Sequence, residues 1–200
     1  MFVAIAYAQL TFGAGGEYEM WVGAQGPLGG VMVLPEEAKA MGAPPHWMSN
    51  VEVSNLDETL AKVRELGGRV YHGPNEVPTV GRFAVIADPQ GGFLSAFQPA
   101  GNEMAPHDSD KYGEFCWSEL ATTDLDGAFN FYSAIFGWEN LQDHHMGPMG
   151  VYRLFGRNGK QWGGMFKKPD GNPMPTAWMY YVQVDDLDAA VGRVTRNGGK

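Results

Sequence analysis

The sequence has little cysteine, few basic side chains and no long hydrophobic run. Cys116 is the single cysteine among 200 residues, which excludes an intrachain disulfide and suits a reducing cytoplasm. The 14 Lys and Arg residues are outnumbered by 23 Asp and Glu, and a net charge of −9 disfavours nucleic acid and anionic lipid as partners. No stretch approaches the roughly 18 consecutive apolar residues that a membrane-spanning helix needs. The apolar run 3–8 is short and has no cationic leader, so we expect no signal peptide and a soluble, cytoplasmic protein.

Hydrophobic residues make up 44% of the chain, which is enough for a packed core. The 28 glycines and 13 prolines predict many turns between short elements. A chain of this length suits one large domain or two small ones.

An internal repeat favours two related domains. The segment 47–68, WMSNVEVSNLDETLAKVRELGG, returns at 178–199 as WMYYVQVDDLDAAVGRVTRNGG. Each copy predicts an alternating strand followed by a helix. In the first copy we expect Ser54 to open the helix with a capping box, Leu56, Leu60 and Val63 to share its apolar stripe, and Gly67 to end it.

The rest of the chain predicts further strands and one strong helix. The helix covers 123–136, with an apolar face that ends before Gly137 and consists of Leu125, Phe129, Tyr132 and Phe136. The predicted strands are 17–22, 29–34, 69–72, 81–87, 92–97, 115–121, 151–155 and 163–166, with another from residue 138. We expect a loop at 73–78 and a polar linker at 99–112.

Three motifs of the second half carry a resemblance to a known family. They are GEFCWSEL at 113–120, TDLD at 123–126 and FYSAIFGW at 131–138. Together with 47–68 and the DPQG turn at 88–91, they resemble the vicinal oxygen chelate superfamily, which includes glyoxalase I, bleomycin-resistance proteins and extradiol dioxygenases. The resemblance implies an α+β fold of tandem glyoxalase-like domains, each built from paired βαβββ modules whose mixed sheets curl into a cup.

The resemblance also implies a domain organisation. Residues 1–98 would form the first domain, without its first strand and helix, and residues 113–200 the second domain, without its last strands. The chain then looks like a slice of a longer two-domain protein. Its open sheet edges leave a homo-oligomer as an alternative.

Enzymes of this superfamily usually hold a metal ion in the cup. Carried over residue by residue, the metal-ligand positions fall on Trp117, Met179, Met48 and Ser95, with a further one near Gly163–Gly164 or Gly29–Gly30. None of these is an ordinary ligand for zinc, nickel or ferrous iron. We therefore expect no metal and no other cofactor. His144 and His145 do not replace the missing ligands, because neighbouring residues of a strand point to opposite faces; we expect them in a surface loop.

Strand alternation then predicts which side chains line the cups. Trp178, Tyr180, Val182 and Val184 form an apolar set that would pack against a helix. The predicted ligand-binding residues are Trp117, Glu119, Met179, Tyr181, Gln183, Met48, Asn50, Glu52, Ser95 and Phe97. Glu119 and Glu52 are candidate general bases if they are buried, or else solvated carboxylates.

Two functions stay open at this point. The leading one is metal-independent binding of a small, partly aromatic organic molecule, for sequestration, resistance or sensing, because a wall of aromatic and thioether groups with a few polar ones is typical of such sites. The alternative is a lyase, isomerase or dioxygenase-like enzyme that uses Glu119, or a metal held by residues not identified above.

Overall fold

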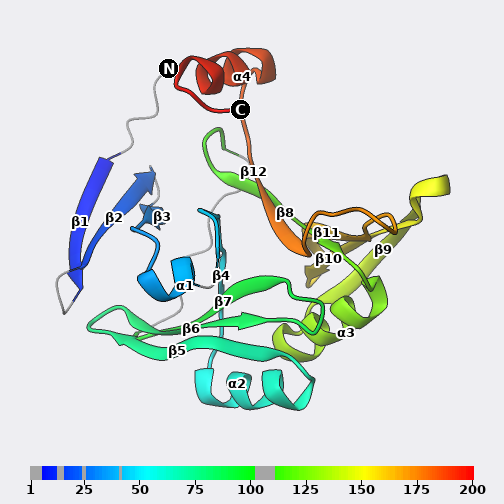
Figure 1. Cartoon of the computed structure of the whole chain (residues 1–200), viewed down its shortest axis with the longest axis horizontal. Helices are drawn as coiled ribbons and strands as arrows, with labels where there is room; N and C mark the ends of the chain where they lie inside the picture. Colours follow the sequence, from blue (N-terminus) through cyan, green and yellow to red (C-terminus); the bar gives the residue numbers. More distant parts are fainter. Residues whose placement is uncertain (1–5, 13–15, 24–25, 41, 102–110) are drawn as a thin grey trace. The chain divides into compact units, whose positions relative to one another are not determined.

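The computed structural model describes residues 6–12, 16–23, 26–40, 42–101 and 111–200 (Figure 1). Contacts between residues divide the described residues into a larger unit, within 45–105 and 117–180, and a smaller unit, within 6–44, 111–116 and 181–200. Most of the predicted linker, and part of the N-terminal apolar run, lie outside the described residues. The domain boundaries 1–98 and 113–200 stay a prediction.

Two mixed sheets form the larger unit (Figure 1). The four-stranded sheet has the order β4-β7-β6-β5, from β4 (Asn50–Glu52), β5 (Arg69–Val77), β6 (Gly81–Ala87) and β7 (Phe93–Pro99). The five-stranded sheet has the order β12-β8-β11-β10-β9, from β8 (Phe115–Thr122), β9 (Glu139–His145), β10 (Val151–Arg157), β11 (Lys160–Lys167) and β12 (Ala177–Val182). The first two residues of β8 and the last two of β12 belong to the smaller unit. The pairs β4–β7 and β8–β11 are parallel. Mixed sheets with few helices confirm the α+β class. The loop predicted at 73–78 is wrong, because β5 continues through it with two shifts of register.

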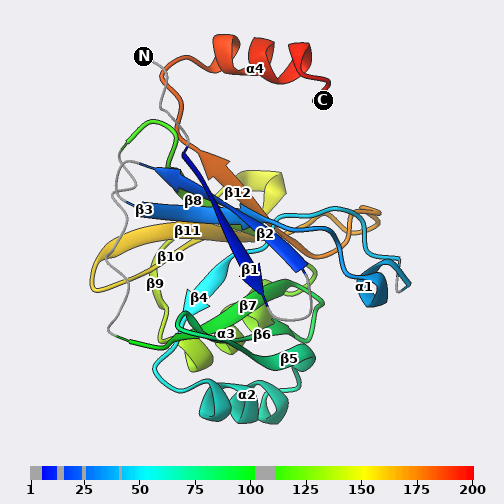
Figure 2. The ribbon, with the colours of Figure 1, turned by 90° about the vertical axis from the view of Figure 1, so that its left-hand side faces the viewer.

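Helix α2 (Leu56–Glu65) lies along β5 of the four-stranded sheet (Figures 1 and 2). Its predicted stripe is confirmed, since Leu56, Leu60 and Val63 are all fully buried. The predicted cap is wrong. Asn55, not Ser54, accepts a hydrogen bond from the backbone N–H of Glu58, and its amide donates back to the Glu58 carboxylate.

Helix α3 (Leu125–Phe136) packs on the five-stranded sheet and contributes half of the buried aromatic side chains of the core. Asp124 caps its start, and Gly137 ends it with a left-handed backbone, as the sequence predicts. Ala128 and Phe131 are buried in addition to the predicted Tyr132 and Phe136, while the predicted Leu125 and Phe129 are only partly buried. The rings of Phe136 and Trp138 stack on Tyr132, and Trp178 meets it edge to face.

A buried polar chain crosses this core. The Tyr132 hydroxyl donates to Asp88 Oδ2 (3.0 Å) and accepts from Trp178 Nε1 (3.1 Å). Asp88 Oδ1 accepts from the backbone N–H groups of Gln90 and Gly92, which closes the β6–β7 turn. Burial raises the pKa of Asp88, against the effect of these hydrogen bonds, and burial raises the pKa of Tyr132 well above its usual value. The chain joins the turn, α3 and β12, which are distant in the sequence.

The smaller unit contains an antiparallel sheet of β1 (Ala6–Phe12), β2 (Gly16–Gly23) and β3 (Gly26–Val31), together with α1 (Glu36–Ala40) and α4 (Leu187–Arg196). The sequence did not predict β1 or α1, and β3 begins and ends three residues earlier than expected. The sequence of helix α4 repeats that of α2, but its apolar side chains are not buried as those of α2 are. Its apolar stripe of Leu187, Val191 and Val194 is at least half exposed. Among the described residues, no helix combines the length and hydrophobicity needed to cross a membrane.

Candidate functional site

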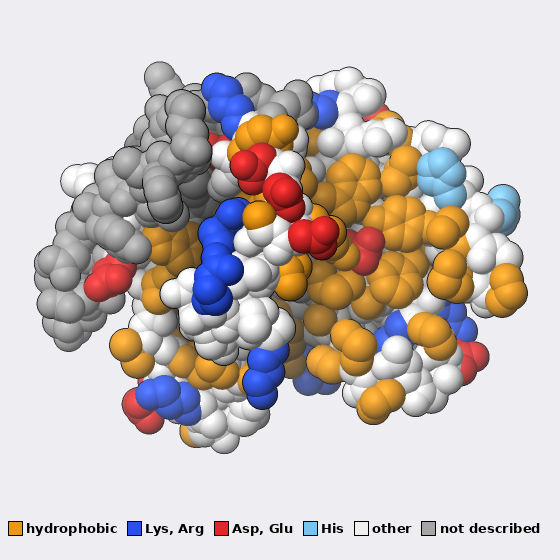
Figure 3. Space-filling model, turned by 90° about the horizontal axis from the view of Figure 1, so that it is seen from above, with side chains coloured by type: hydrophobic (Ala, Val, Ile, Leu, Met, Phe, Trp, Pro, Cys, Tyr) orange, Lys and Arg blue, Asp and Glu red, His pale blue; other side chains and the backbone are white. Residues whose placement is uncertain are grey.

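One face of the five-stranded sheet points away from α3 and the core. Leu120 on β8, Met165 on β11 and Trp178 on β12 belong to the core, so strand alternation puts their neighbours on the opposite face. We name this surface the Glu119 face. It consists of Trp117, Glu119, Tyr152, Gly164, Phe166 and Met179. Hydrophobic side chains gather over this sheet in the view from above (Figure 3).

A chain of hydrogen bonds links three side chains of the Glu119 face. Trp117 Nε1 donates to the hydroxyl of Tyr152 at 2.9 Å, and that hydroxyl donates to Glu119 Oε2 at 2.6 Å. An indole N–H can only donate, so the direction of the chain is fixed: the single phenolic proton goes to the carboxylate. All three side chains are half-buried. Tyr152 thus fixes the positions of both an aromatic ring and a carboxylate.

Gly164 makes this contact possible. Tyr152 lies on β10 and Glu119 on β8, with β11 between them. Gly164 is the β11 residue opposite Glu119, and a Cβ on it would overlap the ring and hydroxyl of Tyr152. The tyrosine therefore lies flat over the glycine to reach β8. Its ring also stacks near Phe166, with centroids 6.3 Å apart and planes inclined by 18°.

The four-stranded sheet carries a second set of predicted residues, which we name the Ser95 face. Asn50 pairs with Ser95, and Glu52 with Phe97, across β4 and β7. Val51, Leu94 and Ala96 pack in or against the core, so these four side chains lie on the opposite face. Asn50 and Glu52 are exposed, whereas Ser95 is buried and its Oγ has no hydrogen-bond partner among the described residues.

The predicted ligand-binding residues therefore separate into groups. Trp117, Glu119 and Met179 come together on the Glu119 face, and Asn50, Glu52, Ser95 and Phe97 on the Ser95 face. Met48 precedes β4 and is 36% exposed. Tyr181 and Gln183 belong to the smaller unit, where the backbone N–H of Gln183 donates to the carbonyl of Glu114.

Sequence reasoning missed Tyr152 and Gly164. The available signal was the glycine pair 163–164 inside a predicted strand, because glycine in a strand interior often marks the close approach of another group. What approaches could not be read from the sequence, since it depends on the order of β8, β11 and β10 in the sheet.

The residues at the implied metal positions do not fit a metal ion. The Trp117 nitrogen is a donor already bound to Tyr152, and an indole offers no lone pair to a cation. The thioethers of Met48 and Met179 are poor ligands for zinc or ferrous iron. Within the described ranges, no group of three or more His, Cys, Asp or Glu side chains is arranged to hold a metal. The surface loop predicted for His144 and His145 is wrong, because both residues belong to the end of β9, although both are exposed as expected.

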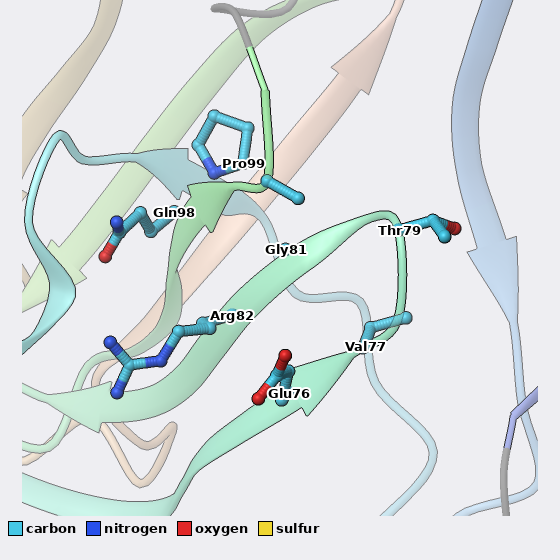
Figure 4. A pocket seen from close by; sticks show the side chains of 8 residues that line it. Glu76, Val77, Thr79, Gly81, Arg82, Gln98 and Pro99 are labelled. Atoms are coloured by element: carbon cyan, nitrogen blue, oxygen red, sulfur yellow. The ribbon is translucent and has the colours of Figure 1, made fainter.

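A pocket of about 230 Å³ lies at one end of the four-stranded sheet (Figure 4). The lining residues labelled there come from β5, β6, β7 and the turn between β5 and β6. Two of its polar side chains, Arg82 and Gln98, bind α2. Arg82 makes two hydrogen bonds to Asp57, of 2.9 and 3.0 Å, which lower the pKa of that carboxyl. The side-chain oxygen Oε1 of Gln98 accepts a hydrogen bond from the backbone N–H of Leu56. The pocket therefore lies where the four-stranded sheet is hydrogen-bonded to α2, and we do not assign it as the functional site.

The sequence of this chain is similar to one protein family and to three curated proteins. Residues 115–200 match the family model described as "Glyoxalase/Bleomycin resistance protein/Dioxygenase superfamily". "Putative glyoxylase CFP32" of Mycobacterium tuberculosis is 28% identical over 188 residues, 94% of this chain and 70% of that protein. A "Glyoxylase-like domain-containing protein" of Didymella fabae is 34% identical over 93 residues, 44% of this chain and 71% of that protein. "Anthracycline biosynthesis protein DauV" of a Streptomyces species is 28% identical over 169 residues, 79% of this chain and 56% of that protein.

Solved structures show the same fold. The Mn(II)-bound glyoxalase from Novosphingobium aromaticivorans aligns with 96% of this chain and 63% of its own, with a TM-score of 0.56 and 14% sequence identity. At that identity the likeness concerns the fold alone.

Proposed function

Since this chain belongs to the Glyoxalase/Bleomycin resistance protein/Dioxygenase superfamily, we propose that its Glu119 face binds a small, partly aromatic organic molecule without a metal ion. Such binding would serve sequestration, resistance or sensing. The observation that carries the proposal is the hydrogen-bonded chain of Trp117, Tyr152 and Glu119. It puts an indole donor at a position where the superfamily's enzymes would place a metal ligand.

The chemistry of the face supports a ring-shaped ligand. Trp117, Tyr152 and Phe166 offer flat, half-buried rings, and Met179 adds a polarisable thioether. The hydrogen bonds hold two of these rings in place before a ligand arrives, which reduces the entropy lost on binding. The similarity to a protein named for anthracycline biosynthesis suggests fused aromatic rings as a first ligand class to try.

Titration with an anthracycline tests the proposal. Binding is followed by tryptophan fluorescence and by calorimetry, on protein treated with a chelator and on the same protein supplied with zinc, nickel, manganese or ferrous iron. We expect saturable binding with equal affinity in all cases. We expect Trp117→Ala to weaken binding by about tenfold, because a half-buried ring and its hydrogen bond are lost.

The matched control is Tyr112→Ala, since Tyr112 is 59% exposed and lies outside the Glu119 face. It should leave the affinity unchanged. Tight, stoichiometric uptake of one of these metals, or binding that requires it, would show that the proposed metal independence is wrong. Equal affinities for Trp117→Ala and Tyr112→Ala would show that the ligand binds elsewhere.

Catalysis is the second candidate, and the 2.6 Å hydrogen bond between Tyr152 and Glu119 favours it. A carboxylate held by a phenol can remove a proton from a bound substrate and return it, as a lyase or isomerase requires. Glu119→Gln keeps the acceptor oxygen for Tyr152 but removes the base. If the protein is an enzyme, this variant should bind substrate and lose turnover, while a binding protein shows no turnover in either form.

A further inference from the structure

Few charged residues lie on the three central strands of the five-stranded sheet. The segments 117–121 of β8, 151–155 of β10 and 163–166 of β11 contain two charged residues, Glu119 and Arg153. They point to opposite sides of the sheet.

Arg153 is committed to the α3 side. Its guanidinium donates to both carboxylate oxygens of Asp143, at 2.9 and 3.0 Å, and to Asp126 of α3 at 2.8 Å. It also lies 5.1 Å from the ring centroid of Phe129, another α3 residue. Its side chain is only 13% exposed. The one cation on these strand segments is therefore fixed behind the sheet.

Two aromatic side chains share the Glu119 face with the carboxylate. Trp117 precedes Glu119 by two residues on the same strand, so the two side chains share the face, and Tyr152 contacts both. A negative carboxylate linked by hydrogen bonds to Tyr and Trp rings is a combination that can attract an organic ammonium group, by charge and by cation–π interaction with a ring.

We propose that the Glu119 face selects a cationic aromatic ligand, in which a protonated amine meets Glu119 while the ring system stacks on Trp117 and Tyr152. This inference rests on the proposed function and adds the ligand's charge to it. The net charge of −9 works in the same direction, because it draws cations toward the protein. A neutral ligand of the same shape would keep the stacking and lose the charge interaction.

Two probes that differ at one nitrogen, charged in one and acetylated in the other, test the inference. One is an anthracycline whose sugar carries a free amine, and the other is its N-acetyl derivative, which is neutral at that nitrogen. We expect the amine to bind about tenfold more tightly than the acetylated probe to the wild-type protein, as a partly desolvated cation–π and carboxylate contact allows. Added salt should narrow the difference, because salt screens charge.

Glu119→Gln separates charge from shape. Its carbonyl oxygen can still accept the Tyr152 hydrogen bond, so the ring positions should survive, while the tenfold preference should fall toward one. Glu119→Asp keeps the charge and should retain a preference for the amine. Glu65→Gln, on the exposed end of α2, makes the same change in net charge far from the face in sequence and should leave the preference unchanged. Circular dichroism spectra and melting temperatures check that the variants fold.

The outcomes are distinguishable. Equal affinity of the two probes for the wild-type protein would overturn the inference and leave the proposed binding function intact. Equal loss of preference in Glu119→Gln and Glu65→Gln would overturn it as well, because net charge alone would then explain the selectivity. Binding of neither probe would overturn the proposed function and the inference with it.

Discussion

The hydroxyl of Tyr132 joins three parts of the core, and its removal provides a strong test of the structure. In Tyr132→Phe the ring stays among its aromatic neighbours and only the oxygen is lost. Asp88 Oδ2 then loses its donor at 3.0 Å, and Trp178 Nε1 loses its acceptor at 3.1 Å. Tyr132 is fully buried, while Asp88 and Trp178 are 3% and 9% exposed. Water therefore has little access to either orphaned group.

The magnitude follows from these two groups. A buried polar group left without a partner costs about 1–3 kcal/mol, and more if it is charged. Asp88 keeps the backbone donors of Gln90 and Gly92 on its other oxygen, which limits its share. We expect the free energy of unfolding to fall by about 2–5 kcal/mol. Because domains are stable by only about 5–15 kcal/mol, such a loss should also lower the melting temperature clearly.

Urea unfolding, followed by near-ultraviolet circular dichroism and tryptophan fluorescence, measures the change. Tyr180→Phe is the matched control. Its hydroxyl accepts from the backbone N–H of Ser49 at 3.0 Å and contacts the Ser49 hydroxyl at 3.1 Å, and Ser49 is only half-buried. We expect this variant to lose about 1 kcal/mol, because water can reach Ser49. If Tyr132→Phe were no less stable than Tyr180→Phe, the buried chain through Asp88 and Trp178 would not exist as described.

Two further predictions concern Gly164 and Asp88. Gly164→Ala should displace Tyr152 from β11, change the tryptophan fluorescence spectrum and weaken anthracycline binding by about tenfold. Gly101→Ala, at a site with open space, should change neither the spectrum nor the affinity. An unchanged spectrum in Gly164→Ala would argue against the contact between Gly164 and Tyr152. Because burial raises the pKa of Asp88, its contribution to stability is complete below 3.8, the ordinary value, and is lost as pH rises through the higher folded value. Asp88→Asn should therefore flatten the dependence of the unfolding free energy on pH over that range. Urea unfolding at a series of pH values measures this dependence, and parallel curves for Asp88→Asn and the wild-type protein would refute the prediction.

Local patterns predicted much of the fold. The stripe of Leu56, Leu60 and Val63 specifies a helix with one buried side by spacing alone, and Gly137 specifies an end to α3 by its backbone freedom. Alternation along each strand also predicted that Trp117, Glu119 and Met179 line cup surfaces, and the order of β12 and β8 in the sheet brings them to one face. These features depend on residues close in sequence, whose geometry is set by a single element.

Other features depend on residues that are far apart in sequence. The contact of Tyr152 with Glu119 requires β11 to lie between β10 and β8, and sequence does not give that order. The chain from Asp88 to Trp178 joins positions about ninety residues apart through Tyr132. The predicted cap of α2 was wrong by one residue. Ser54 and Asn55 are both good N-cap residues, and the backbone places Asn55 where its side-chain oxygen accepts from the Glu58 N–H.

The residues of the Glu119 face depend on one another in a definite order. Gly164 lets Tyr152 lie over β11, Tyr152 then reaches Glu119, and Trp117 donates to the same hydroxyl. Losing the glycine contact therefore disturbs both hydrogen bonds, whereas losing Trp117 leaves the bond between Tyr152 and Glu119 in place. The effects of Gly164→Ala and Trp117→Ala on ligand affinity should accordingly be less than additive, since the first change already displaces what the second removes. Such coupling would be absent if the four residues contributed separately to the face.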